Sequence, residues 1–414
     1  MLELWAHVVQ TISVVLTFVL GHDSDFRTPS TCFKVSRDIG YLAACLDTFT
    51  VPRGYYNTIT YDMAQPIGTQ REDWKTSINT LLSVDGNCSL ASVPVSLHGL
   101  YDIATFQDFC VLFETSSRCG TYLKGWGFMI VPSRRRAVSR DVHISAPHPH
   151  FDGGTVEQAA SVFYSTRSSS LLVAGRARNA FMSPSPCIKS GSMTGAYYRT
   201  DPAHNNEELF FDASIAIHEW QHGRSGCPSR SCGFLQFHGK GTLTCASDHV
   251  FLSTGLGNSS SSQSWYTDNV DRPVKRLQRN LRHSFPSWTV SLPSDSQCPL
   301  TATKNVFGRH LNGIGVPHVC SKAATSRQAT GEFIHAEQAP ISRNPSHYEA
   351  WSKAVLDTFE ATCSAGMVLD AETKLCIPHV GSDLEDDQHA GYTMQGLHPD
   401  RSRWNTVLFS FLLM

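Results

Sequence analysis

The chain has 414 residues, of which 41% are hydrophobic, and its formal net charge at pH 7 is -2. This length allows a full buried core in one large domain or in two domains of ordinary size. Because the charge is nearly balanced and the basic residues form no stripe, the composition argues against a nucleic-acid partner.

The first 21 residues resemble a secretory signal peptide. An apolar stretch ends at Gly21, although Glu3 stands where a positive charge is typical. No other segment approaches the roughly 18 apolar residues of a membrane span, so we expect a secreted protein without a stable span. The C-terminal "WNTVLFSFLLM" is either a marginal lipid-anchor signal or the end of a disordered tail over residues 379–414.

Thirteen cysteines are consistent with export, where disulfides persist. Spacing suggests four local pairs, and the odd total leaves at least one thiol without an intramolecular partner. The four pairs are Cys32 with Cys45, Cys110 with Cys119, Cys227 with Cys232, and Cys363 with Cys376. Two glycosylation sequons begin at Asn87 and Asn258, as expected of a secreted glycoprotein.

The predicted elements begin after a Cys-containing N-terminal extension, residues 22–55, that we expect to be irregular. Residues 56–360 then show short β-rich runs that give way to strands alternating with amphipathic helices. The β-rich runs and strands are residues 93–103, 109–115, 125–132, 141–147, 170–175, 233–239, 250–255, 288–293 and 331–338. The helices are residues 155–167, 213–221, 273–285 and 347–363.

This alternation predicts an α/β fold, a three-layer sandwich in which a mixed, mostly parallel sheet is flanked by helices. The serine-rich segment Gly257–Trp265 is expected to be a flexible surface loop. Residues 361–378 are expected to form a loop bounded by cysteines. In sheets of this kind, functional residues collect in the loops beyond the carboxyl ends of the strands.

Metal-competent side chains stand at two predicted strand ends. "PHPHFD" places His148, His150 and Asp152 on the loop after one strand, and "LQFHG" places His238 at the end of another. A catalytic zinc site needs three protein ligands, often two histidines and a carboxylate, with a fourth position for water. Each histidine alone is more often structural, but the clustering favours a hydrolytic metal site.

The segment "GEFIHAEQ" carries a candidate proton-transfer residue. On a strand, alternation would place Ile334 and Ala336 on the buried face, with His335 and Glu337 pointing together into a site. A glutamate beside a metal-bound water is suited to act as a general base. The alternative is an edge strand with two solvated side chains.

Several motifs occur in an order that resembles a group of zinc hydrolases. The motifs are "APHPHFDGGT", "LLVAGRARNAF", "TDPAH", "FLQFHGKG" and "GEFIHAEQ", between residues 120 and 360. They resemble the N-formylglutamate amidohydrolase and poly-γ-glutamate hydrolase group, which is related in fold to the zinc carboxypeptidases. The resemblance implies an α/β sandwich, a histidine–carboxylate pair after one strand, a histidine after another and a late glutamate as base.

Carried over to this chain, the resemblance implies that His148, Asp152 and His238 bind zinc and that Glu337 is the base. The pair here has the spacing His-xxx-Asp, whereas the carboxypeptidases use His-xx-Glu. This departure leaves the first ligand open between His148 and His150, with His148 favoured because it follows Pro147 at the strand end.

Substrates of the resembling group carry carboxylates, which arginine and amide side chains hold. "AGRARNAF" offers Arg176 and Arg178, of which Arg178 is favoured. "TKNVFGRHLNG" offers three further residues that resemble the group's carboxylate-binding set. These are Asn305, Arg309 and Asn312. Taken alone, each of these arginines is more often a surface or helix-capping residue, which is the alternative interpretation.

The loop "YRTDPAHNN" contains Asp201 and His204. His204 is expected to face the substrate, or the pair supports a metal-bound histidine. A turn capped by the aspartate is the structural alternative.

Together these features predict a secreted zinc-dependent hydrolase that cleaves an amide bond next to a carboxylate in a small acidic or peptide-like substrate. Two alternatives stay open. One is a secreted, disulfide-stabilised binding protein that keeps the scaffold without activity, and the other is an exported carboxypeptidase. The sequence carries no signal for an oligomeric state.

Overall fold

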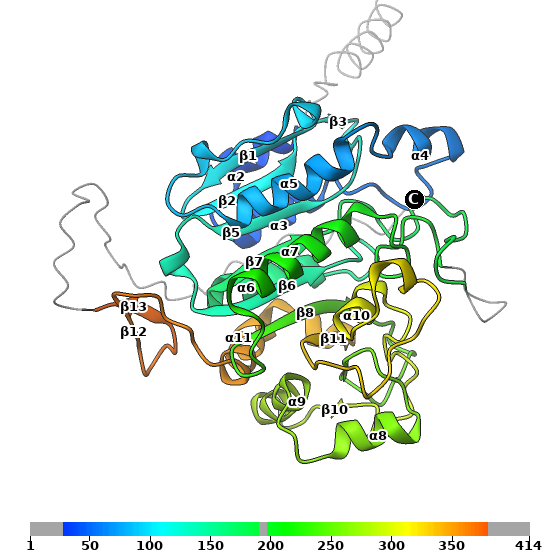
Figure 1. Cartoon of the computed structure of the whole chain (residues 1–414), viewed down its shortest axis with the longest axis vertical. Coiled ribbons are helices and arrows are strands. Elements are labelled where there is room, and N and C mark those ends of the chain that lie inside the picture. Colours follow the sequence, from blue (N-terminus) through cyan, green and yellow to red (C-terminus); the bar gives the residue numbers. More distant parts are fainter. Residues whose placement is uncertain (1–27, 190–196, 380–414) are drawn as a thin grey trace, which may run out of the picture. The chain divides into compact units, whose positions relative to one another are not determined.

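The computed structural model describes residues 28–189 and 197–379 (Figure 1). The predicted signal peptide, residues 1–21, and the predicted tail from residue 380 lie outside these residues. Within the described ranges, no helix combines the length and the apolar character needed to cross a membrane.

A nine-stranded mixed sheet forms the centre of the fold, in the order β1-β2-β5-β7-β6-β8-β11-β9-β10. The four central strands, β7, β6, β8 and β11, run parallel to one another, and antiparallel strands flank them. Two small two-stranded sheets, β3 with β4 and β12 with β13, lie outside it. The strands are β1 Tyr101–Phe106, β2 Phe109–Glu114, β3 Ser117–Arg118, β4 Thr121–Tyr122, β5 Phe128–Pro132, β6 Arg140–Ala146, β7 Ser168–Val173, β8 Cys232–Gly239, β9 Val250–Ser253, β10 Val290–Ser291, β11 Phe333–Gln338, β12 Met367–Leu369 and β13 Cys376–Pro378.

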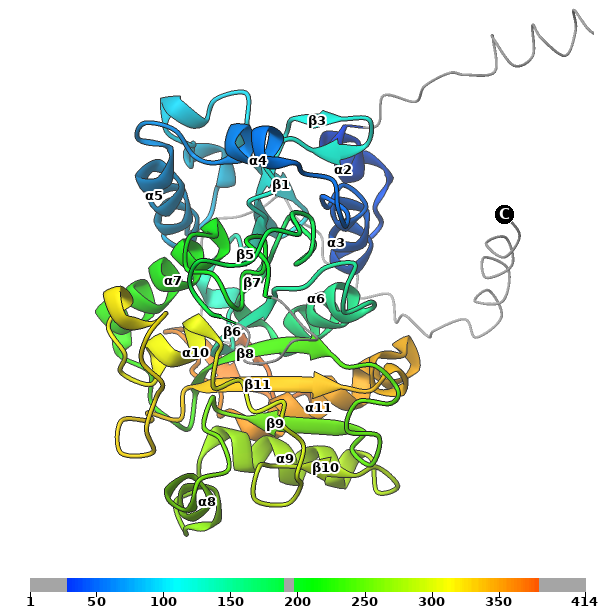
Figure 2. The ribbon, with the colours of Figure 1, turned by 90° about the vertical axis from the view of Figure 1, so that its right-hand side faces the viewer.

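Helices cover both faces of the sheet, which gives the predicted three layers (Figure 2). One face packs against α3, α6, α9 and α11, and the other packs against α5, α7 and α10. The helices are α2 Cys32–Val35, α3 Ile39–Asp47, α4 Thr58–Ala64, α5 Gln70–Leu82, α6 Thr155–Thr166, α7 Leu209–Ser225, α8 Ser260–Thr267, α9 Pro273–Ser284, α10 Val306–Leu311 and α11 Tyr348–Thr358. The short 3-10 helices are η1 Pro29–Thr31, η2 Cys88–Leu90, η3 Val95–Leu97, η4 Arg135–Ala137, η5 Val316–His318, η6 Pro340–Arg343 and η7 Pro345–His347.

The alternation predicted for β11 is confirmed by the two cores. Ile334 and Ala336 are fully buried in the core on the α6 and α11 face, whereas Phe333 belongs to the core on the α7 face. His335 and Glu337 share the side of Phe333, because successive residues of a strand point to opposite faces. The α/β sandwich with a mixed sheet is therefore confirmed, with its parallel part in the centre.

Two expectations about irregular segments are wrong. Residues 22–55 were expected to be irregular, but α3 within them buries Leu42 and Leu46 in the main core. The serine-rich segment was expected to be a flexible loop, yet it contains α8, which buries Trp265 and Tyr266. Ser259 caps this helix by accepting a hydrogen bond from the Ser262 amide, and the two aromatic side chains supply the buried area that serine lacks.

Twelve of the thirteen cysteines form six disulfides. Three of the four predicted pairs are confirmed, and the pairing of Cys110 with Cys119 is wrong because Cys110 bonds Cys88. Cys119 is free and exposed. The other two disulfides join Cys187 to Cys320 and Cys245 to Cys298.

The chain topology places several loops at one edge of the sheet. The loop after β6 leads to α6 on one face, and the loop after the neighbouring β7 leads to α7 on the other. Ligand sites in open α/β sheets form where neighbouring strands send their connections to opposite faces, at the carboxyl ends of the strands. The fold therefore predicts a site beyond β6, β7, β8 and β11.

Candidate metal centre

The loop after β6 folds back so that two predicted ligands meet. The Asp152 amide donates to the His148 carbonyl at 2.9 Å, which closes a turn before α6 begins at Thr155. Nδ1 of His148 consequently lies 3.2 Å from Oδ2 of Asp152, and both side chains are 2% exposed. Gly154 follows with a φ of 84°, a left-handed conformation that suits glycine.

The third predicted ligand, His238, comes from the end of the neighbouring parallel strand β8. Its Nδ1 lies 3.1 Å from Nδ1 of His148 and 3.4 Å from Oδ2 of Asp152. The next residue is Gly239, where an added Cβ would lie 2.6 Å from the Arg343 guanidinium. The glycine thus allows Arg343 to pack directly against the strand end beside the cluster.

A chain of hydrogen bonds determines which His238 nitrogen carries the proton. The Gly308 amide donates to Oδ1 of Asn305 at 2.8 Å, so Nδ2 of Asn305 donates to Oε1 of Gln236 at 2.6 Å. The same Gln236 oxygen lies 2.8 Å from Nε2 of His238. Since this oxygen can only accept, Nε2 of His238 must donate, and Nδ1 of the neutral ring keeps a lone pair that faces the cluster.

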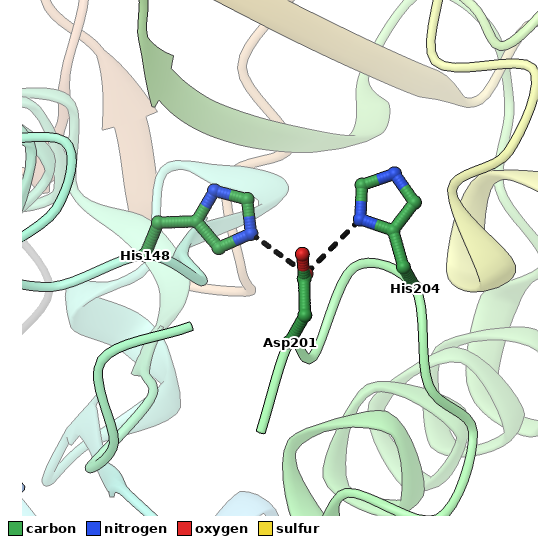
Figure 3. A group of neighbouring side chains, drawn as sticks. All are labelled: His148, Asp201 and His204. Atoms are coloured by element: carbon green, nitrogen blue, oxygen red, sulfur yellow. Dashed lines mark hydrogen bonds and ion pairs between the residues drawn. The ribbon is translucent and has the colours of Figure 1, made fainter. Parts of the chain in front are cut away.

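His148 is held in the same way by a carboxylate. Its Nε2 lies 3.1 Å from Oδ1 of Asp201, which lies between the rings of His148 and His204 in Figure 3. Burial raises the pKa of Asp201, but Arg178, His204 and His148 together hold it well below the usual range. The ionised carboxylate accepts the Nε2 proton. Burial and Arg178 disfavour the charged ring, but the Asp152 and Asp201 carboxylates raise the pKa of His148, so Nδ1 of His148 presents a lone pair to a metal once it has released its own proton.

With both rings neutral, the state in which histidine binds a metal, two nitrogen lone pairs and a carboxylate oxygen face one another at 3.1, 3.2 and 3.4 Å, an arrangement that a cation would stabilise. Tetrahedral zinc has ligand bonds of about 2.0–2.1 Å, which separate its ligand atoms by about 3.3 Å. Metal-bound histidines usually donate their other ring proton to a carboxylate or an amide, as His148 and His238 do here. The donor set and its spacing therefore fit zinc.

A neighbouring group of His148, Asp201 and His204 also brings ligand atoms together. There, however, Asp201 accepts from Nε2 of His148 at 3.1 Å, from Nδ1 of His204 at 3.0 Å and from the Ala203 amide at 3.1 Å. These N–H donors satisfy the carboxylate without a metal. Asp201 and His204 therefore support His148. Support of a metal-bound histidine was one of the roles considered for this loop.

Glu337 lies at the same edge, next to His238 on the adjacent strand. Oε1 of Glu337 is 3.6 Å from Nε2 of His335, and the side chain of Glu337 is 13% exposed. Burial, with the nearby Asp152 carboxylate, raises the pKa of Glu337 to about 8. Burial also keeps the pKa of His335 well below its usual range, so His335 is a neutral neighbour. The two side chains point together, as their alternation predicted.

Three cationic side chains surround this edge. Arg178 donates to Asp201 at 2.5 Å, stacks on Phe151 with its guanidinium carbon 5.0 Å from the ring centre, and is 20% exposed. Lys240 and Arg343 both interact electrostatically with Glu337. The sequence had not indicated these last two. These cationic side chains therefore lie beside the carboxylates of the site.

The structure places the other predicted residues elsewhere. His150 has a φ of 61° and directs Nε2 to the Asp47 carbonyl at 2.9 Å, away from the ligand cluster. Asn305 reaches the cluster only through Gln236. Arg309 is occupied by main-chain carbonyls, with Nε donating to Thr303 and Nη1 to Val319. Arg176 is buried against Glu208, so this arginine is structural.

These contacts alter two of the predicted roles. Because Nε and Nη1 of Arg309 donate to carbonyls before and after α10, Arg309 connects the two segments that flank this helix. Asn305 is a support for His238 rather than a direct substrate contact. The supporting Gln236 had a visible signal, since it stands two residues before His238 on the same face of the strand.

No protein family and no curated protein matches the sequence. Among solved structures, a bacteriophage poly-γ-glutamate hydrolase matches 53% of this chain and 85% of its own, with 12% identity and a TM-score of 0.28. A gene product of Agrobacterium tumefaciens matches 53% of this chain and 91% of its own, with 12% identity and a TM-score of 0.30.

A metallo-carboxypeptidase from Burkholderia cenocepacia matches 56% of this chain and 59% of its own, with 14% identity and a TM-score of 0.27. At these TM-scores the matches support no conclusion about this chain, and the metal centre rests on its own geometry.

Proposed function

We propose that the protein is a zinc-dependent hydrolase that cleaves an amide bond next to a carboxylate. The observation that supports this best is the cluster of His148, Asp152 and His238, in which two lone pairs and a carboxylate oxygen meet with the spacing of zinc ligands. Three protein ligands would leave a fourth position for water or substrate, as catalytic zinc sites require.

The side chains around the cluster suit the remaining steps. A bound zinc would polarise the scissile carbonyl and acidify a water molecule. The ionised form of Glu337, beside the ligands, would accept the proton of the attacking water and return it to the leaving amine, and the positive charge of a bound zinc would favour that form over the protonated one. Asp201 and Gln236 hold the two ligand histidines in one tautomer throughout.

The positive surroundings favour an acidic substrate. Arg178 keeps part of its guanidinium exposed while Asp201 holds it in place, and Lys240 and Arg343 add to the positive charge near Glu337. A guanidinium group binds a carboxylate through paired hydrogen bonds. We therefore propose acyl-amino acids, γ-glutamyl compounds or peptides with a free terminal carboxylate as substrates, with Arg178 as the principal contact.

The proposed setting is extracellular. Six disulfides are compatible with an oxidising environment. Asn87 and Asn258 both lie in exposed positions, where glycan attachment would be sterically open.

The test is turnover of these three substrate classes by the zinc-loaded protein, beside the Glu337→Gln variant. We expect hydrolysis by the wild-type protein and a loss of about 100-fold or more in the variant, with zinc binding at His238 retained. Hydrolysis restricted to peptides with a free C-terminal carboxylate would identify a carboxypeptidase. A zinc-loaded protein that hydrolyses none of the three classes would favour the non-catalytic scaffold and contradict the proposal.

A further inference from the structure

A second group of metal-competent side chains lies outside the proposed active site. His218 and His222 come from α7, and Glu332 comes from the residue before β11. Oε2 of Glu332 lies 3.0 Å from Nε2 of His222 and 3.9 Å from Nε2 of His218. The two imidazole rings are tilted by 51° relative to one another, with centres 4.3 Å apart.

This group lies at the opposite end of the central strands. Glu332 precedes the amino end of β11, whereas Glu337 lies near its carboxyl end beside His238. Five residues of strand separate the two glutamates, which corresponds to about 16 Å at the usual rise of a β-strand. An ion held by Glu332 would therefore be independent of the proposed catalytic ion.

The histidines of α7 have a spacing that suits a shared ligand. They belong to "HEWQH", residues 218–222, and residues four apart on a helix lie on the same face. Two histidines at this spacing on a helix, with a glutamate following the first, form a recurrent zinc-binding pattern. The Cys227–Cys232 disulfide ties the end of α7 to the start of β8 and so restrains the turn that carries His222.

The protonation states and surroundings also favour a cation. Nδ1 of His218 lies 3.3 Å from Nε2 of His310, which can accept its proton and leave Nε2 of His218 as a lone pair beside Glu332. His222 lies in the last turn of α7, where the helix dipole is favourable to positive charge.

We propose that His218, His222 and Glu332 form a second zinc-binding site, separate from the cluster around His238. An ion bonded to all three ligand atoms would draw Nε2 of His218 about half an ångström closer to Glu332. The side chain of His222 is 39% exposed, so water or a small anion can occupy the fourth position. The adjacent Glu219 is exposed and is not one of the three ligands.

The test is zinc stoichiometry after equilibration with zinc and removal of the free ion, measured by elemental analysis. We expect about two zinc ions per chain in the wild-type protein and about one in Glu332→Gln and in His222→Ala. Glu219→Gln is the matched control, since it makes the same chemical change one residue from His218 and should leave two ions bound. His222→Ala removes a largely solvent-accessible side chain from a helix, so the fold should tolerate it.

The His238→Ala variant separates this proposal from the proposed function. A protein in which His238→Ala removes one ion and Glu332→Gln removes the other has both sites. If Glu332→Gln and His222→Ala keep the wild-type zinc content, the second site does not exist, whatever His238→Ala does. If His238→Ala keeps its zinc while Glu332→Gln loses it, the second site stands and the catalytic cluster is wrong.

Discussion

Replacing Gln236 with methionine tests whether an amide oxygen, rather than the metal ligands alone, prepares the proposed zinc site. Oε1 of Gln236 accepts from Nε2 of His238 at 2.8 Å and from Asn305 at 2.6 Å. Methionine keeps the size of the side chain but cannot hold the His238 proton on Nε2. Loss of such a supporting bond typically weakens metal binding by about 10- to 100-fold, which is about 1.4–2.7 kcal/mol.

The assay is a competition titration of zinc against a chromophoric chelator, with Glu332→Gln as the background so that only the His238 site is counted. Gln158→Met is the control, because Gln158 is equally buried and bonds Gln338 and Ser342 away from the ligand cluster. The control should lower the free energy of unfolding and leave zinc affinity unchanged. Wild-type zinc affinity in Gln236→Met would refute the idea that Gln236 sets the tautomer of His238.

Three further outcomes are expected. Glu337→Gln should keep its zinc and lose about 10²- to 10⁴-fold in kcat, measured on whichever substrate the wild-type protein hydrolyses. An unchanged kcat would exclude Glu337 as the base. Replacing Cys187 and Cys320 by alanine should lower the free energy of unfolding, measured by calorimetry, by about 2–5 kcal/mol, because this disulfide spans 133 residues. Cys119→Ser, which changes a free cysteine, should leave the free energy of unfolding unchanged. Burial raises the pKa of Glu114 from 4.5 to about 7, so the folded protein binds this proton more tightly than the unfolded chain. The free energy of unfolding should therefore fall by about 3 kcal/mol as the pH rises from about 4.5 to 7, and urea titrations of Glu114→Gln should show a smaller fall.

The sequence predicted those parts of the site whose signals are local. His148 and Asp152 stand four residues apart on one loop, and His238 stands at the end of a strand whose pattern is clear. The alternation of β11 also placed His335 and Glu337 on one side. Such local signals are sufficient because the carboxyl ends of parallel strands meet at one edge of a sheet.

The roles that depend on distant contacts could not be predicted in this way. Arg309 and Arg178 look alike in sequence, but carbonyls of a neighbouring loop occupy the first, and Asp201 orients the second. The partner of Cys110 is 22 residues away, so the shorter spacing to Cys119 was misleading. The "HEWQH" of α7 meets its proposed third ligand, Glu332, only through the fold, because Glu332 stands more than a hundred residues later in the chain.

The helix over Ser260–Thr267 was missed for a different reason. Its composition lacks an apolar repeat, and its stability depends on two aromatic side chains and a serine cap. Serine has a modest helix propensity, so only tertiary burial makes this segment helical.

The most direct test of the account is the anomalous scattering of zinc in crystals of the wild-type protein. If His148, Asp152 and His238 bind zinc, we predict a zinc peak about 2.0–2.2 Å from Nδ1 of His148, from Nδ1 of His238 and from the carboxylate of Asp152. A peak between His148, Asp201 and His204 instead, or zinc-soaked crystals without a peak at the His238 cluster, would contradict it.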